Sequence, residues 1–221
     1  MFIRTLRAAG ALLLTLASSM PGASIAFAQI PPQGVFTYHF DPARTGANVN
    51  ETILTPGTVS AATFGKLFAD PVDGQIYTQP LYVASVAIPG QGSHNVVYVA
   101  TENDTVYAFD ADIAGAPLWQ TSLLTNAGTA VPSSDTGCGD LTPVIGVTGT
   151  PVIDPGTNTL YVVANTKEGD PTTPSYVQRL HALDIATGAE KFGGPVAIAA
   201  AVPGTGDGGN GLPSPSIHFS R

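Results

Sequence analysis

The stretch from Asn95 to Asp110 constrains the fold more than any other part of the chain. It reads N-V-V-Y-V-A-T-E-N-D-T-V-Y-A-F-D, so β-branched and aromatic residues alternate on both sides of a short polar turn, Glu102-Asn103-Asp104. Alternation with a period of two, interrupted by an Asn-Asp turn, is typical of a β-hairpin. We therefore expect two antiparallel strands here.

This hairpin belongs to a unit that occurs twice in the chain. The matching segments are Gln79–Val83 with Thr150–Asp154, Val97–Ala100 with Leu160–Val163, Val106–Asp110 with Leu180–Asp184, and Leu118-Trp119 with Lys191-Phe192. We expect the second copy to have the longer hairpin loop, Lys167–Ser175, and we interpret Phe64–Val72 as the last strand of an earlier unit. Four strands with a fixed order of turns are the signature of a propeller blade. The sequence thus predicts an all-β fold, a partial β-propeller of four-stranded antiparallel blades.

The turn of the second copy carries the most specific signal. Residues 182–192 read A-L-D-I-A-T-G-A-E-K-F and resemble the A-x-D-x-x-T-G-x-x-x-W docking motif of quinoprotein (PQQ-repeat) β-propellers. The motif positions are Ala182, Asp184, Thr187, Gly188 and Phe192 here, and Ala108, Asp110 and Trp119 in the first copy, where Asp112–Ala116 replaces the Thr-Gly turn.

The resemblance implies a fold like that of quinoprotein alcohol dehydrogenases. It implies that the Asp and Thr close the turn between the outer strands, and that the aromatic ring packs between neighbouring blades. Other propellers and a β-sandwich are the alternative folds. Because the motif is structural, it favours the fold without identifying a cofactor. Pyrroloquinoline quinone and calcium are therefore expected from the family resemblance only.

The N-terminus reads as an export signal. Arg4 and Arg7 precede a short apolar run, residues 8–17, and Ala26-Phe27-Ala28 is a typical cleavage site before Gln29. The apolar run is short for a membrane span, although an uncleaved anchor is the alternative interpretation. We expect a secreted or periplasmic protein with no transmembrane span after cleavage.

The remaining boundaries follow from this signal and from the repeats. We assign residues 1–28 to the signal peptide, 29–63 to a lead-in segment, 64–210 to the end of one blade plus two blades, and 211–221 to an irregular tail. Closed propellers have about four to eight blades, so the sequence is interpreted as a truncated family member. The tail lacks a strand pattern, and we hypothesise that it is read out of frame.

Charge excludes one class of partner. The chain has 8 Lys and Arg against 16 Asp and Glu, a formal net charge of −8. A nucleic-acid surface needs clustered Lys and Arg, which this chain lacks. A small-molecule partner and a protein partner both remain open.

One loop is the best candidate for a binding site. Residues 126–145 form the longest stretch without strand periodicity, and its centre holds four candidate cofactor-binding residues, Asp135, Cys138, Asp140 and Thr142. In a propeller such a loop enters the strand that lines the central channel, where carboxylates, a thiol and flexible glycines can bind a cation or a substrate. The alternative is a solvated loop with Asp-capped turns. No catalytic residue and no metal ligand set can be assigned.

The only cysteine, Cys138, cannot form an internal disulfide. In an exported protein it indicates a missing partner or a free thiol, and a small buried residue is the third reading. The first hypothesis for the function is an exported PQQ-repeat propeller fragment, ancestrally a PQQ-dependent dehydrogenase-like oxidoreductase. Such a fragment is not expected to be catalytic alone, because a channel site draws side chains from several blades. The alternative is a non-enzymatic binding or scaffold propeller of the periplasm or cell envelope.

Overall fold

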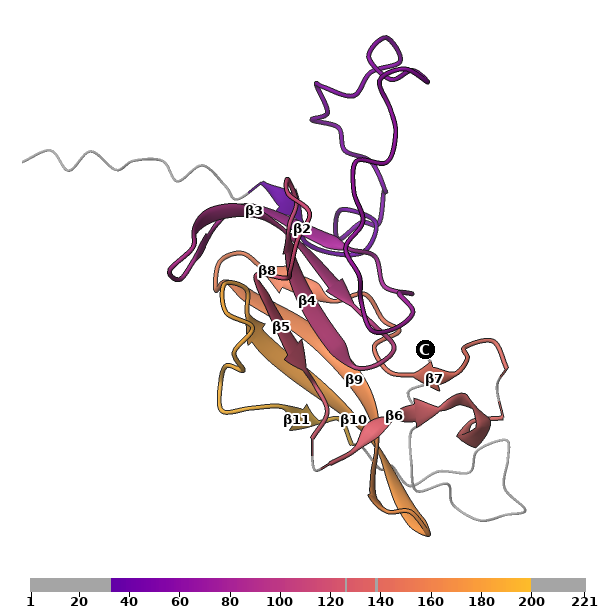
Figure 1. Cartoon of the computed structure of the whole chain (residues 1–221). Coiled ribbons are helices and arrows are strands. Elements are labelled where there is room, and N and C mark those ends of the chain that lie inside the picture. Colours follow the sequence, from indigo (N-terminus) through magenta and orange to yellow (C-terminus); the bar gives the residue numbers. More distant parts are fainter. Residues whose placement is uncertain (1–32, 126, 138, 200–221) are drawn as a thin grey trace, which may run out of the picture. The chain divides into compact units, whose positions relative to one another are not determined.

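The computed structural model describes residues 33–125, 127–137 and 139–199, and within these ranges the protein is all-β, with no α-helix (Figure 1). All described strands lie in the same compact unit of the chain. The residues assigned to the signal peptide, Cys138 and the tail 211–221 lie outside the described residues. The described part of the chain contains no helix of the length and apolar character that a membrane crossing requires.

The first sheet is antiparallel and has five strands in the order β1-β2-β3-β4-β5. These are β1 (Gly34–Val35), β2 (Leu81–Ile88), β3 (Gly92–Ala100), β4 (Thr105–Asp110) and β5 (Trp119–Ser122). The hairpin predicted between residues 95 and 110 is confirmed, because β3 pairs with β4 and places Tyr98 opposite Ala108. The lead-in segment adds the edge strand β1, in which Gly34 lies opposite Val83.

The strand predicted at Phe64–Val72 is wrong. No strand occurs between β1 and β2, and the side chains of Phe64 and Leu67 are 70% and 90% exposed. A strand is stable only when its backbone groups bond to a neighbouring strand, and an apolar pattern cannot supply that neighbour.

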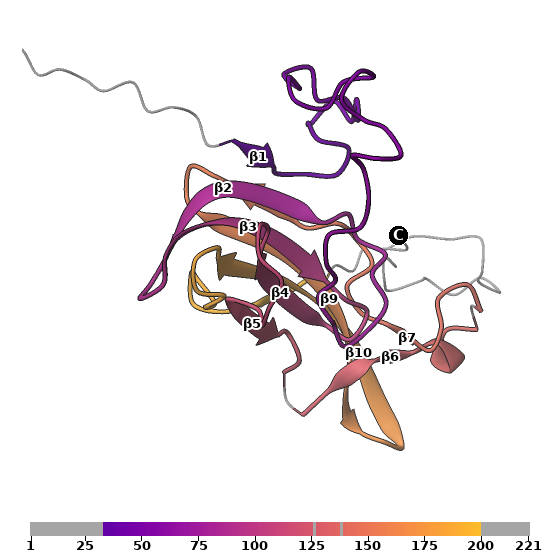
Figure 2. The ribbon, with the colours of Figure 1, turned by 45° about the horizontal axis from the view of Figure 1, so that its top comes forward.

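The second sheet is also antiparallel. Its strands are β8 (Val152–Asp154), β9 (Thr159–Asp170), β10 (Thr173–Asp184) and β11 (Val196–Ala197). Two further strands extend it: β6 (Thr129–Pro132) pairs with β9 at Thr166 and Lys167, and β7 (Val144–Ile145) pairs with β6. Figures 1 and 2 show β9 and β10 as one long hairpin beside the first sheet.

Three expectations for this region need correction. Lys167–Ser175 is the tip of the β9–β10 hairpin, whose pairing runs to Asp170 and Thr173. The stretch 126–145 contains β6, β7 and a 3-10 turn, Ser133–Asp135. Lys191-Phe192 is not a strand, since only a single bridge, Leu183 to Glu190, precedes β11. In each case pairing with β9 or β10 decides the local structure, and single-strand periodicity does not reveal it.

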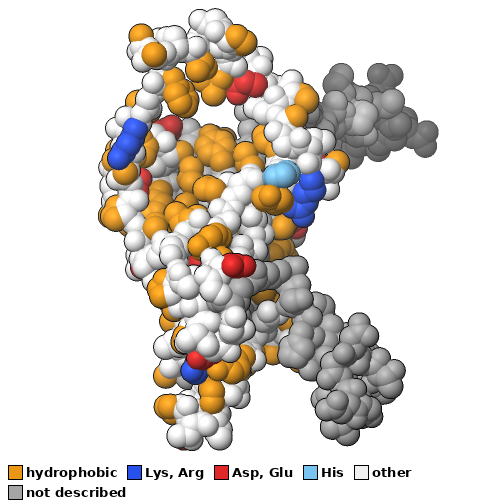
Figure 3. Space-filling model, turned by 90° about the vertical axis from the view of Figure 1, so that its right-hand side faces the viewer, with side chains coloured by type: hydrophobic (Ala, Val, Ile, Leu, Met, Phe, Trp, Pro, Cys, Tyr) orange, Lys and Arg blue, Asp and Glu red, His pale blue; other side chains and the backbone are white. Residues whose placement is uncertain are grey.

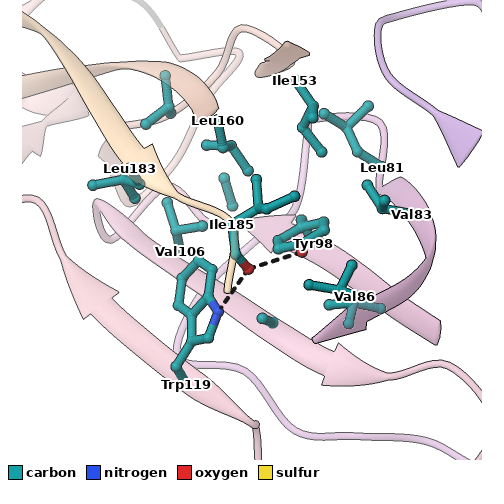
Figure 4. Close-up of a cluster of buried hydrophobic side chains, with 14 of the residues drawn as sticks. Leu81, Val83, Val86, Tyr98, Val106, Trp119, Ile153, Leu160, Leu183 and Ile185 are labelled. Atoms are coloured by element: carbon teal, nitrogen blue, oxygen red, sulfur yellow. Dashed lines mark hydrogen bonds between the residues drawn. The ribbon is translucent and has the colours of Figure 1, made fainter. Parts of the chain in front are cut away.

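The two sheets share one apolar core. The first sheet contributes Val96, Tyr98, Val106 and Ala108, and the second sheet with the turn after β10 contributes Leu160, Val162, Leu183 and Ile185. Figure 4 labels Tyr98, Val106, Leu160, Leu183 and Ile185 of this cluster. These side chains are nearly inaccessible to solvent, and burying one large aliphatic side chain contributes about 1.5–3 kcal/mol. The core therefore fixes how the second sheet lies on the first.

Candidate functional site

The turn that follows β10 is one of the places where the second sheet contacts the first. One carboxylate oxygen of Asp184 accepts hydrogen bonds from the backbone N–H of Ala186 (3.0 Å) and of Thr187 (3.1 Å), and from the Thr187 hydroxyl (3.1 Å). Gly188 has φ = +69°, a conformation that glycine adopts without steric cost. Asp184 and Thr187 thus close the turn, as the docking-motif resemblance implies.

Trp119, at the start of β5, packs onto this turn. Its Nε1 donates to the carbonyl oxygen of Ile185 (3.1 Å), which also accepts the hydroxyl of Tyr98 (2.9 Å) (Figure 4). The hydroxyl of Thr121 donates to the Gly188 carbonyl oxygen (2.8 Å). A Cβ on Gly188 would lie 2.5 Å from an atom of the indole ring. The indole therefore fills the space between the sheets, and the absence of a side chain at Gly188 makes room for it.

The other motif positions behave differently. Ala108 is fully buried and Ala182 is half-buried. Phe192 is 72% exposed, with the ammonium nitrogen of Lys191 5.4 Å from its ring centroid. The packing between sheets that the resemblance implies for this position is thus absent among the described residues. The physical reason is that none of the described strands covers the ring.

Asp110 closes no Thr-Gly turn but forms a pair with His94. The carboxylate lies 2.6 Å from His94 Nδ1 and accepts the backbone N–H of Asp112 (2.8 Å). The hydrogen bond to His94 lowers the pKa of Asp110, and the same bond raises the pKa of His94. Ser85 and Ser93 line a hollow of about 390 Å³ beside the pair, but His94 Nε2 is itself 3.1 Å from the Gln91 carbonyl oxygen. The imidazole has no free nitrogen with which to activate either serine.

The loop chosen from the sequence does not gather its candidates into one site. Asp135 accepts hydrogen bonds from Lys167 Nζ (2.5 Å) and the hydroxyl of Tyr176 (2.9 Å), near the tip of the β9–β10 hairpin. The bonds from Lys167 and Tyr176 hold the pKa of Asp135 below its usual value. Asp140 and Thr142 are exposed, and Cys138 lies outside the described residues. Asp135 therefore anchors the loop to the hairpin.

A hollow of about 400 Å³, lined by both polar and apolar side chains, lies at the end of the β3–β4 hairpin. It is lined by Asp73, Asn103, Thr105, Ser122, Leu124, Thr129, Ala130 and Val144. The carboxylate of Asp73 accepts the hydroxyls of Thr101 (2.7 Å) and Thr105 (2.6 Å), and Asn103 Nδ2 donates to the Asp73 carbonyl oxygen. The carboxylate of Asp73 is already hydrogen-bonded, so the hollow suits a small neutral ligand better than acid–base chemistry.

Sequence reasoning missed the two carboxylates that lie deepest. Glu102 and Asp104 flank Asn103 in the β3–β4 turn, and both are fully buried. Glu102 Oε2 accepts the backbone N–H of Gly146 (2.7 Å) and the hydroxyl of Thr148 (3.0 Å). From the sequence alone, E-N-D is typical of a solvated hairpin turn. The residues that bury these two carboxylates lie more than forty positions further along the chain, so the local sequence does not reveal them.

The described residues contain no group of three or more His, Cys, Asp or Glu side chains placed to hold a metal ion. Comparisons with known protein families, with curated proteins and with solved structures found no match to this chain.

Proposed function

We propose that the chain is part of an exported, quinoprotein-like β-propeller, in which β2–β5 and β8–β11 are two successive blades. The observation that carries the proposal is the docking of Trp119 on the Ile185–Gly188 turn. An aromatic ring from the last strand of one repeat unit sits against the Asp-Thr-Gly turn of the next, as the quinoprotein motif requires. The matching pairing order of the two hairpins gives further support.

This chain alone is proposed to be non-catalytic, with its oxidoreductase ancestry retained only in the fold. The acidic and imidazole groups nearest to its hollows already have partners within the protein, as in the His94–Asp110 pair and the Asp73 hydroxyl contacts. A quinone site in a propeller channel would draw side chains from several blades.

The test combines export with cofactor binding. The full chain is expressed in a bacterial host, the periplasmic fraction is collected, and the mass of the protein shows whether cleavage occurred after Ala28. The purified protein is dialysed against pyrroloquinoline quinone with and without calcium, and dye reduction is assayed with alcohols and sugars. We expect export with cleavage, and neither bound quinone nor dye reduction. Retention in the cytoplasm contradicts the export part, and quinone-dependent turnover contradicts the non-catalytic part.

A scaffold that binds another protein is the second candidate. It is favoured by the strandless segment between β1 and β2, where Ile53, Leu54, Phe64 and Leu67 are each more than half exposed. Figure 3 also shows apolar side chains gathered in a recess on one face, with acidic and basic side chains around its rim. Exposed apolar surface of this kind marks protein contacts. Replacement of Phe64 and Leu67 by serine should abolish partner capture in cross-linking from the periplasm without changing the melting temperature.

A further inference from the structure

The Glu102 and Asp104 carboxylates lie where the first sheet joins the second. Asp104 Oδ1 accepts the backbone N–H of Asn165 in β9 at 3.4 Å, while Glu102 Oε2 binds the chain that leads into β8. Both carboxyl groups lie beside Gly146, whose N–H donates to Glu102 Oε2 and at which an added Cβ would lie 2.8 Å from Asp104 Oδ1. The two acids therefore occupy a single site within the joint.

Each acid leaves one oxygen unsatisfied. Among the described residues, Glu102 Oε1 and Asp104 Oδ2 are buried and have no hydrogen-bond partner. Two ionised carboxylates in such surroundings would be strongly unfavourable, because no donor among the described residues satisfies the second oxygen of either group. The cationic side chains nearest along β9 and β10 are bound elsewhere, Lys167 to Asp135 and Arg179 to Glu168.

A proton satisfies this site better than a metal ion. Calcium requires about six to eight oxygen ligands and magnesium about six, whereas the described residues place no group of three or more acidic or imidazole side chains together. The backbone of Gly146 also packs tightly, since a Cβ there would lie 2.3 Å from the Glu102 carbonyl oxygen. A proton needs no added volume, and it converts one unsatisfied acceptor into a donor.

We propose that the Glu102–Asp104 pair holds one proton in the joint between the two sheets and thereby makes their docking depend on pH. With the proton bound to Asp104, the site carries the single negative charge of Glu102. When the proton is lost, the site holds two buried negative charges, and the joint loosens. Leu123, which follows β5, donates its N–H to the Asp104 carbonyl oxygen (2.7 Å), so loosening reaches the strand that carries Trp119.

The surroundings of the two acids indicate that Asp104 is the group that carries the proton. Burial is the main cause that raises the pKa of Asp104 to about 8, and the negative charges of Glu102, on the same turn, and Asp73, on the segment before β2, act in the same direction. From β9 the opposing influence is the Asn165 N–H alone. The unfolded chain releases this proton near pH 3.8, so the folded chain binds more protons between pH 3.8 and about 8. Stability must therefore fall as pH rises through that window, by up to about tenfold in the unfolding constant per pH unit.

The experiment uses the full chain and its single tryptophan, Trp119, as the reporter of sheet docking. Fluorescence spectra and urea unfolding are recorded from pH 5 to pH 9 for the wild type, for Asp104→Asn and for a matched control, Asp170→Asn, at the exposed tip of the β9–β10 hairpin. We expect the wild type and the control to lose stability up to about pH 8, with a shift of the emission to longer wavelength, and Asp104→Asn to lack this component. Parallel pH profiles for Asp104→Asn and the wild type would overturn the proposal.

Two further measurements keep the proposal testable if Asp104→Asn does not fold. Carbon NMR of wild-type protein labelled at its aspartate carboxyl carbons should show one group that titrates near pH 8, and a spectrum in which every group is ionised at pH 7 contradicts the proposal. Addition of calcium at pH 7 should leave the melting temperature unchanged. A calcium-dependent rise that Glu102→Gln abolishes would show that the pair binds a cation, and the proton assignment would then be wrong.

Discussion

The two copies of the repeat place their aromatic residues in opposite environments. Trp119 is about 9% exposed, and its indole donates a hydrogen bond to the next sheet, whereas Phe192, at the matching position, is 72% exposed. The turn that follows β10 receives Trp119, while the corresponding stretch after β4 is held by the His94–Asp110 pair. The same position in the repeat is thus a core residue in one copy and a surface residue in the other.

This difference shows that the docking motif stabilises an interface rather than a single sheet. The turn closed by Asp184 forms without help from Phe192, since its hydrogen bonds are local. The energetic value of the aromatic position comes from the sheet against which it packs. Substitutions on the two copies should therefore have very unequal effects on the free energy of unfolding.

The largest effect is expected from Trp119→Ala. It removes a buried indole and leaves the Ile185 carbonyl oxygen with one donor fewer, so we expect a loss of about 3–5 kcal/mol in urea unfolding followed by circular dichroism. Trp119→Phe retains the ring and should lose about 1 kcal/mol from the missing hydrogen bond. Equal losses for the two variants would show that the ring does not fill the joint.

Gly188→Ala should rank second. A side chain at φ = +69° costs about 1–2 kcal/mol, and crowding against the indole adds about 1–3 kcal/mol. The matched control is Gly90→Ala, because Gly90 has φ = +75° and nothing within 4 Å of its Cβ position. The control should show the backbone cost alone. If both variants are equally destabilised, the close contact between Gly188 and Trp119 is wrong.

Asp184→Ala should have a smaller effect, about 1–2 kcal/mol, because several hydrogen bonds to one carboxylate oxygen are lost and the turn that receives Trp119 becomes less ordered. Asp170→Ala is the control, since one carboxylate oxygen of Asp170 accepts similar bonds from the backbone N–H and the hydroxyl of Thr172 at the exposed tip of the β9–β10 hairpin. Thermal unfolding should show the larger drop for Asp184→Ala. Only that variant should shift the tryptophan emission to longer wavelength.

The smallest effect is expected for Phe192→Ala. An exposed ring makes few contacts, so the free energy of unfolding should change by no more than about 0.5 kcal/mol. A loss comparable to that of Trp119→Ala would mean that Phe192 is buried in solution, and the comparison between the two copies would fail.

The sequence correctly predicted the local features, whose structure is decided by residues close together in the chain. The hairpin around Asn103 follows from alternation, and the turn at Asp184 from the Asp-Thr-Gly spacing. Prediction from the sequence failed where contacts with a distant segment decide the local structure. Phe64–Val72 has no strand to pair with, and the burial of Glu102 depends on Gly146 and Thr148. Local pattern carries no information on such long-range contacts.

A double-mutant cycle between Trp119 and Gly188 tests the central claim, that one repeat docks on the turn of the next through these two residues. Trp119→Ala, Gly188→Ala and the double variant are compared with the wild type by urea unfolding followed by circular dichroism. Because removal of the indole relieves the crowding, Gly188→Ala should cost at least about 1 kcal/mol less in the Trp119→Ala background than in the wild type. Strictly additive losses would contradict the docking.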